Sequence, residues 1–408
     1  MPPNSQMTFR QTLACALLTL CAGTGVAAEK TLDIGLSDSL TGPGAVYGLA
    51  QANAVKMAVE EINGSGGIKA GADTYKLNVI AYDDKTNPTE GTNAVRKLID
   101  RDNVKYIVGF CCSGPTSAVA SFIAKEPVVM LVGNAAERSV TTLGANNLLR
   151  TRPPADFTGA AAGTFVAQKG VKNIAVIGNL DISFYTQYLE AFEREFAKAG
   201  GKIVARESFG LKDRDMTPQL TKVRALNPDS LLVIGYVEPS AFVYRQAIEM
   251  GMNMPRFGFT SGSEEQFLKV ATSEQMEGVW DLRPIELTLD ALGPVARKYA
   301  DNYSKKFGTA AAPSSPYAYD QVYVLKHAIE AAGTATDAAK VAVAAHQIAI
   351  PGEAVMKYLP VSGKMFDQSG QAYTANGAFQ WQKGKWVFVS DLPSDAMLYS
   401  DYLKSLRK

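Results

Sequence analysis

Short apolar segments alternate with helical segments along most of the chain, and this alternation limits the possible folds more than any other feature of the sequence. Apolar runs at residues 31–36, 77–82 and 104–109 read as strands, and helical patterns follow them, as at 89–100. Short strands that alternate with amphipathic helices predict a parallel sheet covered by helices on both faces. The sequence therefore predicts an α/β fold.

The alternation is interrupted at residues 150–156, where Arg-Thr-Arg-Pro-Pro-Ala-Asp breaks the pattern, and a second series then begins. The strands expected in this series lie at residues 174–178, 203–209, 230–236 and 256–259. About 380 residues follow the N-terminal signal described below, which is more than one hydrophobic core usually holds. We therefore expect two doubly wound parallel-sheet lobes.

After Trp280 the sequence returns to helical patterns and then ends in a short β-rich segment, which indicates that the chain passes between the lobes more than once. The expected division is a signal peptide at 1–28, a first lobe at 29–152 plus 283–376, and a second lobe at 153–282 plus 377–408. A hinge is expected to join the lobes. Ligands of open α/β sheets bind beyond the carboxyl ends of the strands, so the loops after strands are the candidate sites.

The first 28 residues have the composition of a removable export signal. Arg10 supplies positive charge, residues 13–21 form an apolar core, and Val26-Ala27-Ala28 is a small-residue cleavage pattern. The core is shorter than the roughly 20 apolar residues that span a membrane. We expect cleavage near Ala28 and a periplasmic location, with an uncleaved N-terminal anchor as the alternative.

Charge and histidine content exclude several classes of function. Without residues 1–28 the chain carries 40 basic and 40 acidic side chains, so its net charge gives no electrostatic case for binding nucleic acid or an anionic membrane. His327 and His346 are the only histidines, and neither Cys-x-x-Cys nor His-Glu-x-x-His occurs. Neither a metal site nor a cofactor is therefore expected.

Enzyme signatures are also missing. The turn at residues 35–44 has the wrong spacing for a dinucleotide-binding Gly-x-Gly-x-x-Gly motif and contains a proline, and no Gly-x-Ser-x-Gly or phosphate-binding Gly-Lys-Ser/Thr sequence occurs. The acidic pairs Asp83-Asp84 and Glu264-Glu265 point apart on a strand or a helix and read as solvated loop charges. We expect no catalytic residues, and an enzyme such as a hydrolase is kept as an alternative.

Six segments carry a family resemblance. They are Leu-Thr-Gly-Pro-Gly-Ala-Val-Tyr-Gly (40–48), Glu-Ile-Asn-Gly-Ser-Gly-Gly-Ile (61–68), Tyr-Asp-Asp (82–84), Val-Gly-Phe-Cys-Cys-Ser (108–113), Tyr-Arg-Gln-Ala (244–247) and Tyr-Ala-Tyr-Asp (317–320). Their order and spacing resemble the type I periplasmic binding proteins of the leucine/isoleucine/valine-binding kind, over essentially the whole chain after residue 28. The resemblance implies a ligand held between two lobes by hinge closure and delivered to the membrane permease of an ABC importer. A monomer is expected.

The resemblance assigns the ligand carboxylate to Ser113, at the start of a predicted helix, where a hydroxyl and backbone N–H groups suit an anion. A plain helix cap is the alternative for Ser113. Asn134, Ala135 and Ala136 correspond to the loop after the fourth strand, where Ala136 replaces the family's threonine. Ala135 could still offer its backbone N–H, and Arg138 could pair with a carboxylate through two hydrogen bonds.

Four aromatic residues match positions that the family places against the ligand or beside it. Phe184, Tyr185 and Tyr236 come from the second lobe, and Tyr47 comes from the turn of the first lobe. Tyr185 stands where a glycine is usual. A purely structural role in the core is the alternative for each aromatic residue.

The main departure from the family concerns the α-ammonium group of an amino acid. Amino-acid binders hold it with an acidic residue, and the corresponding position here is Ser261. An ammonium without a partner in a closed cleft would cost several kcal/mol. We therefore expect a carboxylate that lacks an α-ammonium, aromatic or otherwise apolar. An amino acid held by Glu264 or Glu265 is the second hypothesis, and a ligand sensor that feeds a signalling partner is the third.

Cys111 and Cys112 are the only cysteines after residue 28, and adjacent cysteines cannot join distant segments. They form either free buried thiols or a vicinal disulfide. The family's cysteine after Tyr-Asp-Asp is absent, with Thr86 nearby, so the resemblance implies that Cys112 lacks its usual partner.

Overall fold

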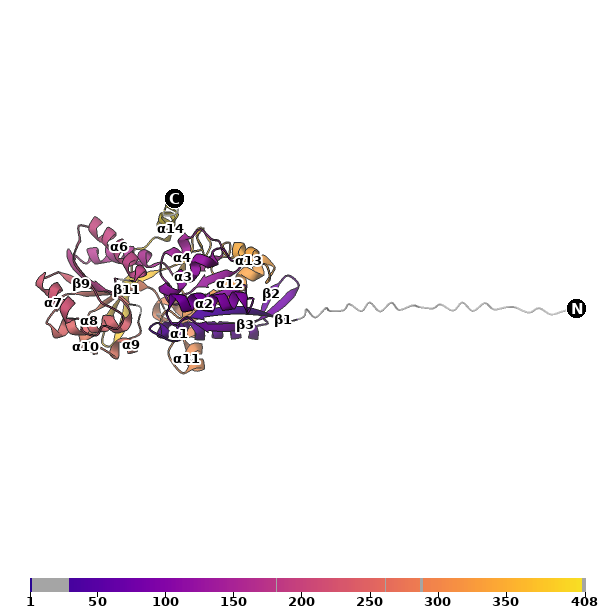
Figure 1. Ribbon diagram of the computed structural model, residues 1–408, viewed down its shortest axis with the longest axis horizontal. Coiled ribbons are helices and arrows are strands. Elements are labelled where there is room, and N and C mark those ends of the chain that lie inside the picture. The colour runs from indigo at the N-terminus through magenta and orange to yellow at the C-terminus, as the bar shows by residue number, and fades with distance from the viewer. Residues whose placement is uncertain (2–28, 181, 261, 287–288, 406–408) are drawn as a thin grey trace.

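The computed structural model describes Met1 and residues 29–180, 182–260, 262–286 and 289–405. The predicted signal peptide at 1–28 lies, apart from Met1, outside the described residues. The described chain forms two main β-sheets with helices packed against both, and these two bodies, the first and the second lobe, lie next to each other along the long axis of the molecule (Figure 1). The predicted α/β fold with two doubly wound sheets is confirmed.

The sheet of the first lobe has the strand order β2-β3-β1-β4-β5-β6 among the described residues. Its strands are β1 (Glu29–Asp38), β2 (Ile68–Ala70), β3 (Asp73–Asp83), β4 (Tyr106–Gly109), β5 (Val129–Val132) and β6 (Leu148–Arg150), all parallel except β2. The helices of this lobe are α1 (Ala45–Gly64), α2 (Pro88–Asp100), α3 (Ser113–Ile123), α4 (Ser139–Thr142), α11 (Leu289–Phe307), α12 (Pro316–Ala332) and α13 (Ala338–Ala345).

Side-chain alternation along the strands divides the core of the first lobe into two layers. Tyr106 and Val108 of β4 pack with α1, α11, α12 and α13 on one face, whereas Ile107 packs with α2 and α3 on the other. Successive strand residues point to opposite faces, so a strand that is apolar throughout needs helices on both sides. This requirement explains the continuous apolar runs seen in the sequence.

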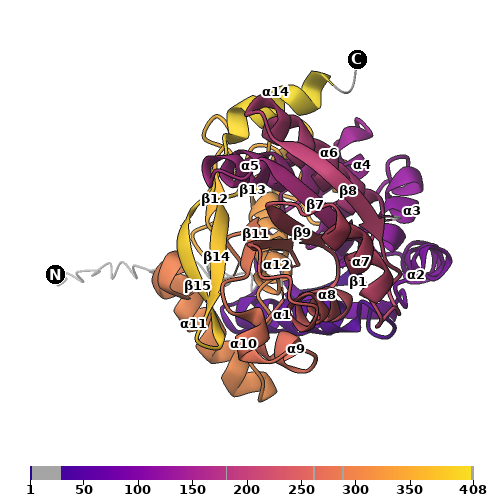
Figure 2. The same ribbon diagram turned by 90° about the vertical axis from the view of Figure 1, so that its left-hand side faces the viewer.

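The sheet of the second lobe has the order β15-β14-β11-β10-β9-β7-β8 among the described residues. Its strands are β7 (Asn173–Gly178), β8 (Lys202–Ser208), β9 (Ser230–Ile234), β10 (Arg256–Phe259), β11 (Trp280–Pro284), β14 (Asn376–Gln382) and β15 (Lys385–Asp391); a separate pair consists of β12 (Tyr358–Leu359) and β13 (Tyr373–Thr374). The helices are α5 (Ala155–Gln168), α6 (Ser183–Lys198), α7 (Thr217–Ala225), α8 (Val237–Glu249), α9 (Glu264–Leu268), α10 (Ser273–Met276) and α14 (Ala396–Ser405). The antiparallel hairpin β14–β15, drawn in yellow, closes one edge of this sheet (Figure 2).

The described chain passes between the lobes in three places. The first crossing joins β6 to α5, the second joins β11 to α11, and the third leads from β13 to β14. The helices after β11 return to the core of the first lobe. The exact domain boundaries stay a prediction; β11 continues to Pro284, two residues beyond the predicted boundary at 282.

Two glycines allow α5 and α6 to pack unusually closely in the second lobe. A Cβ atom on Gly159 would lie 2.2 Å from the carbonyl oxygen of Tyr188, and one on Gly163 would lie 2.3 Å from that of Phe192. Both distances are far shorter than a carbon–oxygen contact allows, and backbone atoms cannot rotate away as a side chain can. The helix pair therefore depends on the absence of side chains at these positions.

We expect Gly163→Ala to lower the free energy of unfolding by about 1–3 kcal/mol, because the added methyl group forces the two helices apart. Gly64→Ala is the matched control, since a Cβ at Gly64, also in a helix, meets nothing within 4 Å. Alanine there should be neutral or stabilising by up to about 1 kcal/mol. Urea unfolding followed by circular dichroism measures both changes. Equal stability of the two variants would contradict the close-packing explanation.

A buried carboxyl group ends the central strand β1. Asp38 Oδ1 accepts hydrogen bonds from the backbone N–H groups of Ser39 and Cys111, each at 3.0 Å, while Oδ2 has no hydrogen-bond partner among the described residues. Burial raises the pKa of Asp38 from its usual 3.8 to about 7, and the neighbouring carboxyl of Asp84 adds to the rise. The folded protein therefore holds a proton on Asp38 that the unfolded chain releases at lower pH.

This difference makes stability depend on pH. Below about pH 4 both states bind the proton, so the stabilising contribution of Asp38 is complete. As the pH rises to about 7, only the folded state keeps the proton, and the free energy of unfolding falls by at most about 4 kcal/mol. Asp38→Asn resembles the protonated acid and does not titrate. The free energy of unfolding of this variant should therefore not show the fall between about pH 4 and about pH 7 that Asp38 causes in the wild type. Burial also raises the pKa of Asp320 to about 7. Asp320 is present in both proteins, so its contribution to the pH dependence cancels in the difference between them.

Urea unfolding of wild type and Asp38→Asn at about pH 5 and about pH 8 measures the difference. Asp391→Asn, a change at an exposed carboxyl at the end of β15, is the control and should follow the wild type at both pH values. A wild-type protein that gains stability over Asp38→Asn as the pH rises would show that Asp38 is charged in the folded state.

Candidate ligand-binding site

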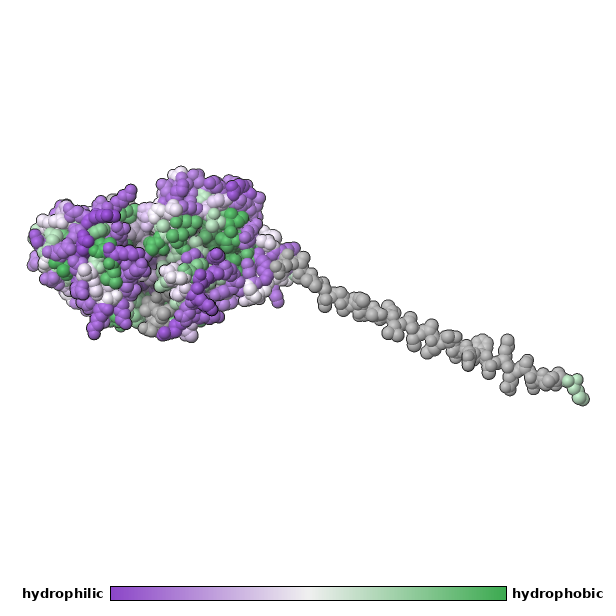
Figure 3. Space-filling model, turned by 90° about the horizontal axis from the view of Figure 1, so that it is seen from below, coloured by the Kyte–Doolittle hydropathy of each residue, from purple (hydrophilic) through white to green (hydrophobic). Residues whose placement is uncertain are grey.

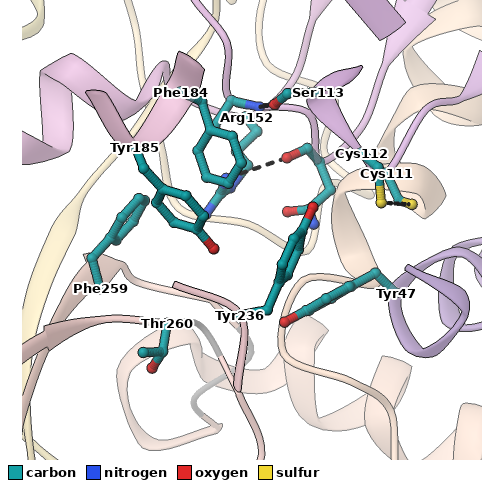
Figure 4. A pocket seen from close by; sticks show the side chains of 12 residues that line it. Tyr47, Cys111, Cys112, Ser113, Arg152, Phe184, Tyr185, Tyr236, Phe259 and Thr260 are labelled. Atoms are coloured by element: carbon teal, nitrogen blue, oxygen red, sulfur yellow. Dashed lines mark hydrogen bonds between the residues drawn. The ribbon is translucent and has the colours of Figure 1, made fainter. Parts of the chain in front are cut away.

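The carboxyl ends of parallel strands from both lobes face one cavity. Asp38 and Gly109 end β1 and β4 in the first lobe, and Ile234 and Phe259 end β9 and β10 in the second. The lining residues are Tyr47, Cys111, Cys112, Ser113, Asn134, Ala136, Arg152, Phe184, Tyr185, Tyr236, Phe259 and Thr260, and Figure 4 shows the rings of Phe184, Tyr185 and Tyr236 gathered around a common space. This is the strand-end position where open α/β sheets bind ligands.

The first-lobe wall is built around the start of α3. Gly109 and Phe110 have positive φ values of 107° and 66°, and they turn the chain so that Ser113 becomes the first residue of the helix. Ser113 is buried, and its hydroxyl oxygen accepts the backbone N–H of Ala136 at 3.2 Å. The hydroxyl proton of Ser113 thus remains available for a ligand at the positive end of the α3 dipole.

Arg152 brings a cation to this wall. It follows β6 on the first crossing, and its side chain is 5% exposed. Nη1 donates to the carbonyl oxygen of Asn134 at 3.2 Å, and Nη2 lies 3.5 Å from Glu286 Oε1. The other oxygen of Glu286 lies 3.4 Å from Arg283 Nη1, so two guanidinium groups share one buried carboxylate. These contacts fix the direction of the Arg152 side chain.

The second-lobe wall is aromatic. Phe184 and Tyr185 lie in the first turn of α6, Tyr236 precedes α8, and Phe259 ends β10. The ring centroids of Tyr185 and Tyr236 are 6.0 Å apart, and those of Tyr236 and Tyr47 are 5.9 Å apart across the lobes. Burial raises the pKa values of Tyr47, Tyr185 and Tyr236, so these phenols stay neutral at physiological pH. The wall presents apolar rings with neutral hydroxyl groups.

Most of the residues predicted from the sequence line this cavity. They are Tyr47, Ser113, Asn134, Ala136, Phe184, Tyr185 and Tyr236. Their contacts with a ligand stay a prediction.

The structure does not bring Ala135 or Arg138 to the cavity. The backbone N–H of Ala135 donates to the carbonyl of Phe110 at 3.0 Å, and Arg138 Nη1 donates to Asp156 Oδ2 at 2.9 Å. Both groups are therefore engaged elsewhere. Ser261 lies outside the described residues.

Sequence reasoning missed Arg152, Cys111, Cys112, Phe259 and Thr260 as lining residues. Arg152 stands in the segment that breaks the strand–helix alternation, and the sequence predicts no strand before it, whereas the structure places β6 there. The two cysteines are buried free thiols whose Sγ atoms lie 2.6 Å apart, and burial raises the pKa of the Cys111 thiol. The only sequence feature that could have identified the two cysteines as lining residues is their position directly before Ser113.

The cavity chemistry suits a small anion with an apolar body. None of its described lining residues carries a carboxylate, whereas Arg152 supplies a positive charge. In the described part of the chain, no group of three or more His, Cys, Asp or Glu side chains is arranged to hold a metal ion. Among the described helices, none has the length and apolar character needed to cross a membrane.

The chain resembles binding proteins over most of its length. It is 28% identical over 320 residues to the leucine-, isoleucine-, valine-, threonine- and alanine-binding protein of Pseudomonas aeruginosa, covering 77% of this chain and 82% of the relative. It is 27% identical over 378 residues to a Leu/Ile/Val-binding protein of Rhizobium johnstonii, covering 92% of this chain and 99% of the relative. The names of these relatives describe binding proteins and not enzymes.

Solved structures share the fold. The branched-chain amino acid transporter substrate-binding protein of Streptococcus pneumoniae, in complex with isoleucine, matches with a TM-score of 0.76 and 23% identity over 90% of this chain and all of that chain. A solute-binding protein of an ABC transporter from Rhodopseudomonas palustris, in complex with benzoate, matches with a TM-score of 0.76 and 17% identity over 90% of this chain and 98% of that chain. The family model for periplasmic binding proteins matches residues 31–385, and the chain therefore belongs to the periplasmic binding protein family.

Proposed function

We propose that this chain is an exported solute-binding protein that holds an aromatic carboxylate without an α-ammonium group between its lobes and delivers it to the permease of an ABC importer. The observation that carries the proposal is the guanidinium group of Arg152 in a cavity whose lining includes five aromatic residues. A buried cation beside apolar rings is complementary to a ligand that has one negative end and one flat apolar end.

The first lobe offers two groups for the carboxylate. Arg152 is held in direction by Asn134 and Glu286, and the Ser113 hydroxyl lies at the start of α3. Charge-assisted hydrogen bonds from guanidinium to carboxylate are stronger than neutral ones, and a site that is already ordered loses less entropy on binding. We assign Arg152 as the principal partner of the carboxylate and Ser113 as the second.

The second lobe then covers the ring of the ligand. Phe184, Tyr185 and Tyr236 belong to the second lobe and line the cavity together with Arg152, so we expect them to contact a first-lobe ligand only when the lobes are close together. Ligand contacts that exist only in the closed state shift the equilibrium toward closure. The closed form is the one that we expect a permease to recognise.

An amino acid is the second candidate, since the relatives named above bind leucine, isoleucine and valine. An α-ammonium group would need a carboxylate partner. Glu264 and Glu265, the two acids that the second hypothesis assigns to this role, have other partners. Glu264 Oε1 accepts the backbone N–H of Trp386 at 3.0 Å, and Glu265 Oε1 lies 3.1 Å from Lys269 Nζ. Neither is among the lining residues of the cavity. These contacts favour the aromatic carboxylate.

The same fold is compatible with such ligands. Besides the benzoate complex, a Rhodopseudomonas palustris solute-binding protein in complex with 3,4-dihydroxybenzoic acid matches this chain with a TM-score of 0.73 and 19% identity. At this identity the likeness concerns the fold, so the ligand class rests on the residues of the cavity.

A thermal-shift panel tests the ligand class. Benzoates and phenylpropanoids should raise the unfolding temperature at millimolar concentration, because a ligand that binds only the folded state stabilises it. Dicarboxylates and aliphatic amino acids should have little effect. A panel in which only amino acids stabilise the protein would refute the proposal.

Substitution of Arg152 tests the assigned role. Arg152→Gln should weaken binding of the best aromatic carboxylate by at least about 100-fold, because a buried charged partner is lost, and Arg152→Lys should lose less. Arg138→Gln is the matched control and should change the affinity little, since Arg138 pairs with Asp156. Isothermal titration calorimetry gives the dissociation constants, and circular dichroism checks that each variant is folded. Equal losses in the Arg152 and Arg138 variants would contradict the assignment.

A further inference from the structure

A larger groove adjoins the cavity on the solvent side. It is lined by Gly42, Pro43, Val46, Tyr47, Leu211, Tyr236, Val237, Glu238, Pro239, Gln266, Lys269 and Val270, and we call it the outer groove. Residues 42–47 belong to the first lobe and the others to the second, so the groove lies between the lobes like the cavity. The space-filling view shows hydrophobic patches on the surfaces of both lobes (Figure 3).

Tyr47 and Tyr236 line both spaces, so the partition between cavity and outer groove includes two side chains. Tyr236 is only partly buried and packs against Tyr47. A side chain moves by rotation about its χ angles on a fast timescale, whereas a backbone partition would need the fold to change. A chain of atoms can therefore pass from the cavity into the outer groove with the fold intact.

The two spaces differ in size. The cavity has a volume of ≈ 40 Å³ and the outer groove one of ≈ 520 Å³. An apolar cavity that holds one benzene ring has a volume of roughly 150 Å³. The cavity in this conformation thus has room for little more than the charged end of a ligand, and the remaining atoms need the adjoining space.

The wall of the outer groove combines apolar side chains with Glu238, Gln266 and Lys269, and its two charged side chains are paired. Val46 on α1 and Leu211 in the loop after β8 are 45% and 39% exposed, and they come from opposite lobes. The charged groups are balanced, since Glu238 lies 3.5 Å from Arg214 and Lys269 lies 3.1 Å from Glu265. A neutral apolar chain that covers Val46 and Leu211 would remove their surface from water, which is favourable.

We infer that the outer groove is a second subsite, which takes an apolar chain carried by the aromatic carboxylate on the side opposite its acid group. This inference rests on the proposed function and narrows its ligand class. The acid end lies at Arg152 and Ser113, the ring passes Tyr47 and Tyr236, and the chain lies along Val46 and Leu211. A benzoate with a para-alkyl chain has this shape.

The test compares benzoate with para-ethyl-, para-butyl- and para-hexylbenzoate by isothermal titration calorimetry. Each buried methylene group should strengthen binding by about fourfold until the groove is filled, so para-butylbenzoate should bind at least about 30-fold more tightly than benzoate. In the double variant Val46→Ser/Leu211→Ser the ratio of the two dissociation constants should fall to within about threefold of one. Leu226→Ser, at a leucine that is 54% exposed at the end of α7, is the matched control and should keep the wild-type ratio.

The outcomes separate the two proposals. Benzoate binding without any gain from longer chains would overturn the subsite and leave the aromatic-carboxylate function standing. A gain that survives in the Val46→Ser/Leu211→Ser variant would also overturn the subsite, because the chain would then bind elsewhere. Failure of every benzoate to bind, with binding of leucine instead, would overturn the proposed function and the subsite together.

Discussion

Buried charged side chains meet where the chain passes between the lobes, and the arrangement of the cleft depends on them. Arg152 on the first crossing shares the fully buried Glu286, on the second crossing, with Arg283, and Arg283 also pairs with Asp281 at 3.0 Å. The segment that leads into β13 joins the group through Gln371, whose amide donates to the carbonyl oxygen of Arg152 at 2.7 Å. Buried charges are costly unless they are paired, so the three segments are held in one arrangement.

The same network sets the charge of the ligand site. Glu286 and Asp281 face the two arginines and are not among the lining residues of the cavity, whereas Arg152 is. Its guanidinium group has five N–H donors, and the planar arrangement of these donors matches a carboxylate. The side chain that we propose as the partner of the ligand carboxylate thus also belongs to the charged group at the crossings. Under that proposal, the stability of the crossings and the recognition of the ligand depend on the same arginine.

The fold class and most of the residues that line the cavity could be predicted from the sequence, and the reasons are physical. A strand with helices on both faces is apolar at every position, and such runs can be recognised without a structure. The resemblance assigned Ser113, Phe184, Tyr236 and Tyr47 to the site. The first three also follow strands, and the carboxyl ends of parallel strands meet at one edge, so the order of elements supported their assignment.

Arg152, Arg138 and Ala135 illustrate what the sequence could not supply. Arg152 reaches the cavity because the first crossing runs beside the cavity. A crossing segment has no periodic sequence pattern, so the direction of its side chains cannot be predicted from the sequence. Arg138 is bound to Asp156, a residue of α5 eighteen positions later, and this pairing depends on how α5 packs against the first lobe. The partners of these three residues depend on contacts between different helices, strands and loops. Sequence periodicity gives information only about single helices or strands.

The positions of Glu264 and Glu265 support the proposal of a ligand without an ammonium group. Glu264 begins α9 and binds the backbone of the β14–β15 hairpin at Trp386, so moving it into the cleft would leave that N–H without its partner and disturb the sheet edge. Glu265 faces Lys269 on the outer surface of the same helix. Neither acid is therefore placed to pair with an α-ammonium group in the cleft. An ammonium group buried without a carboxylate partner would cost several kcal/mol, and a carboxylate that lacks this group, as we propose, avoids that cost.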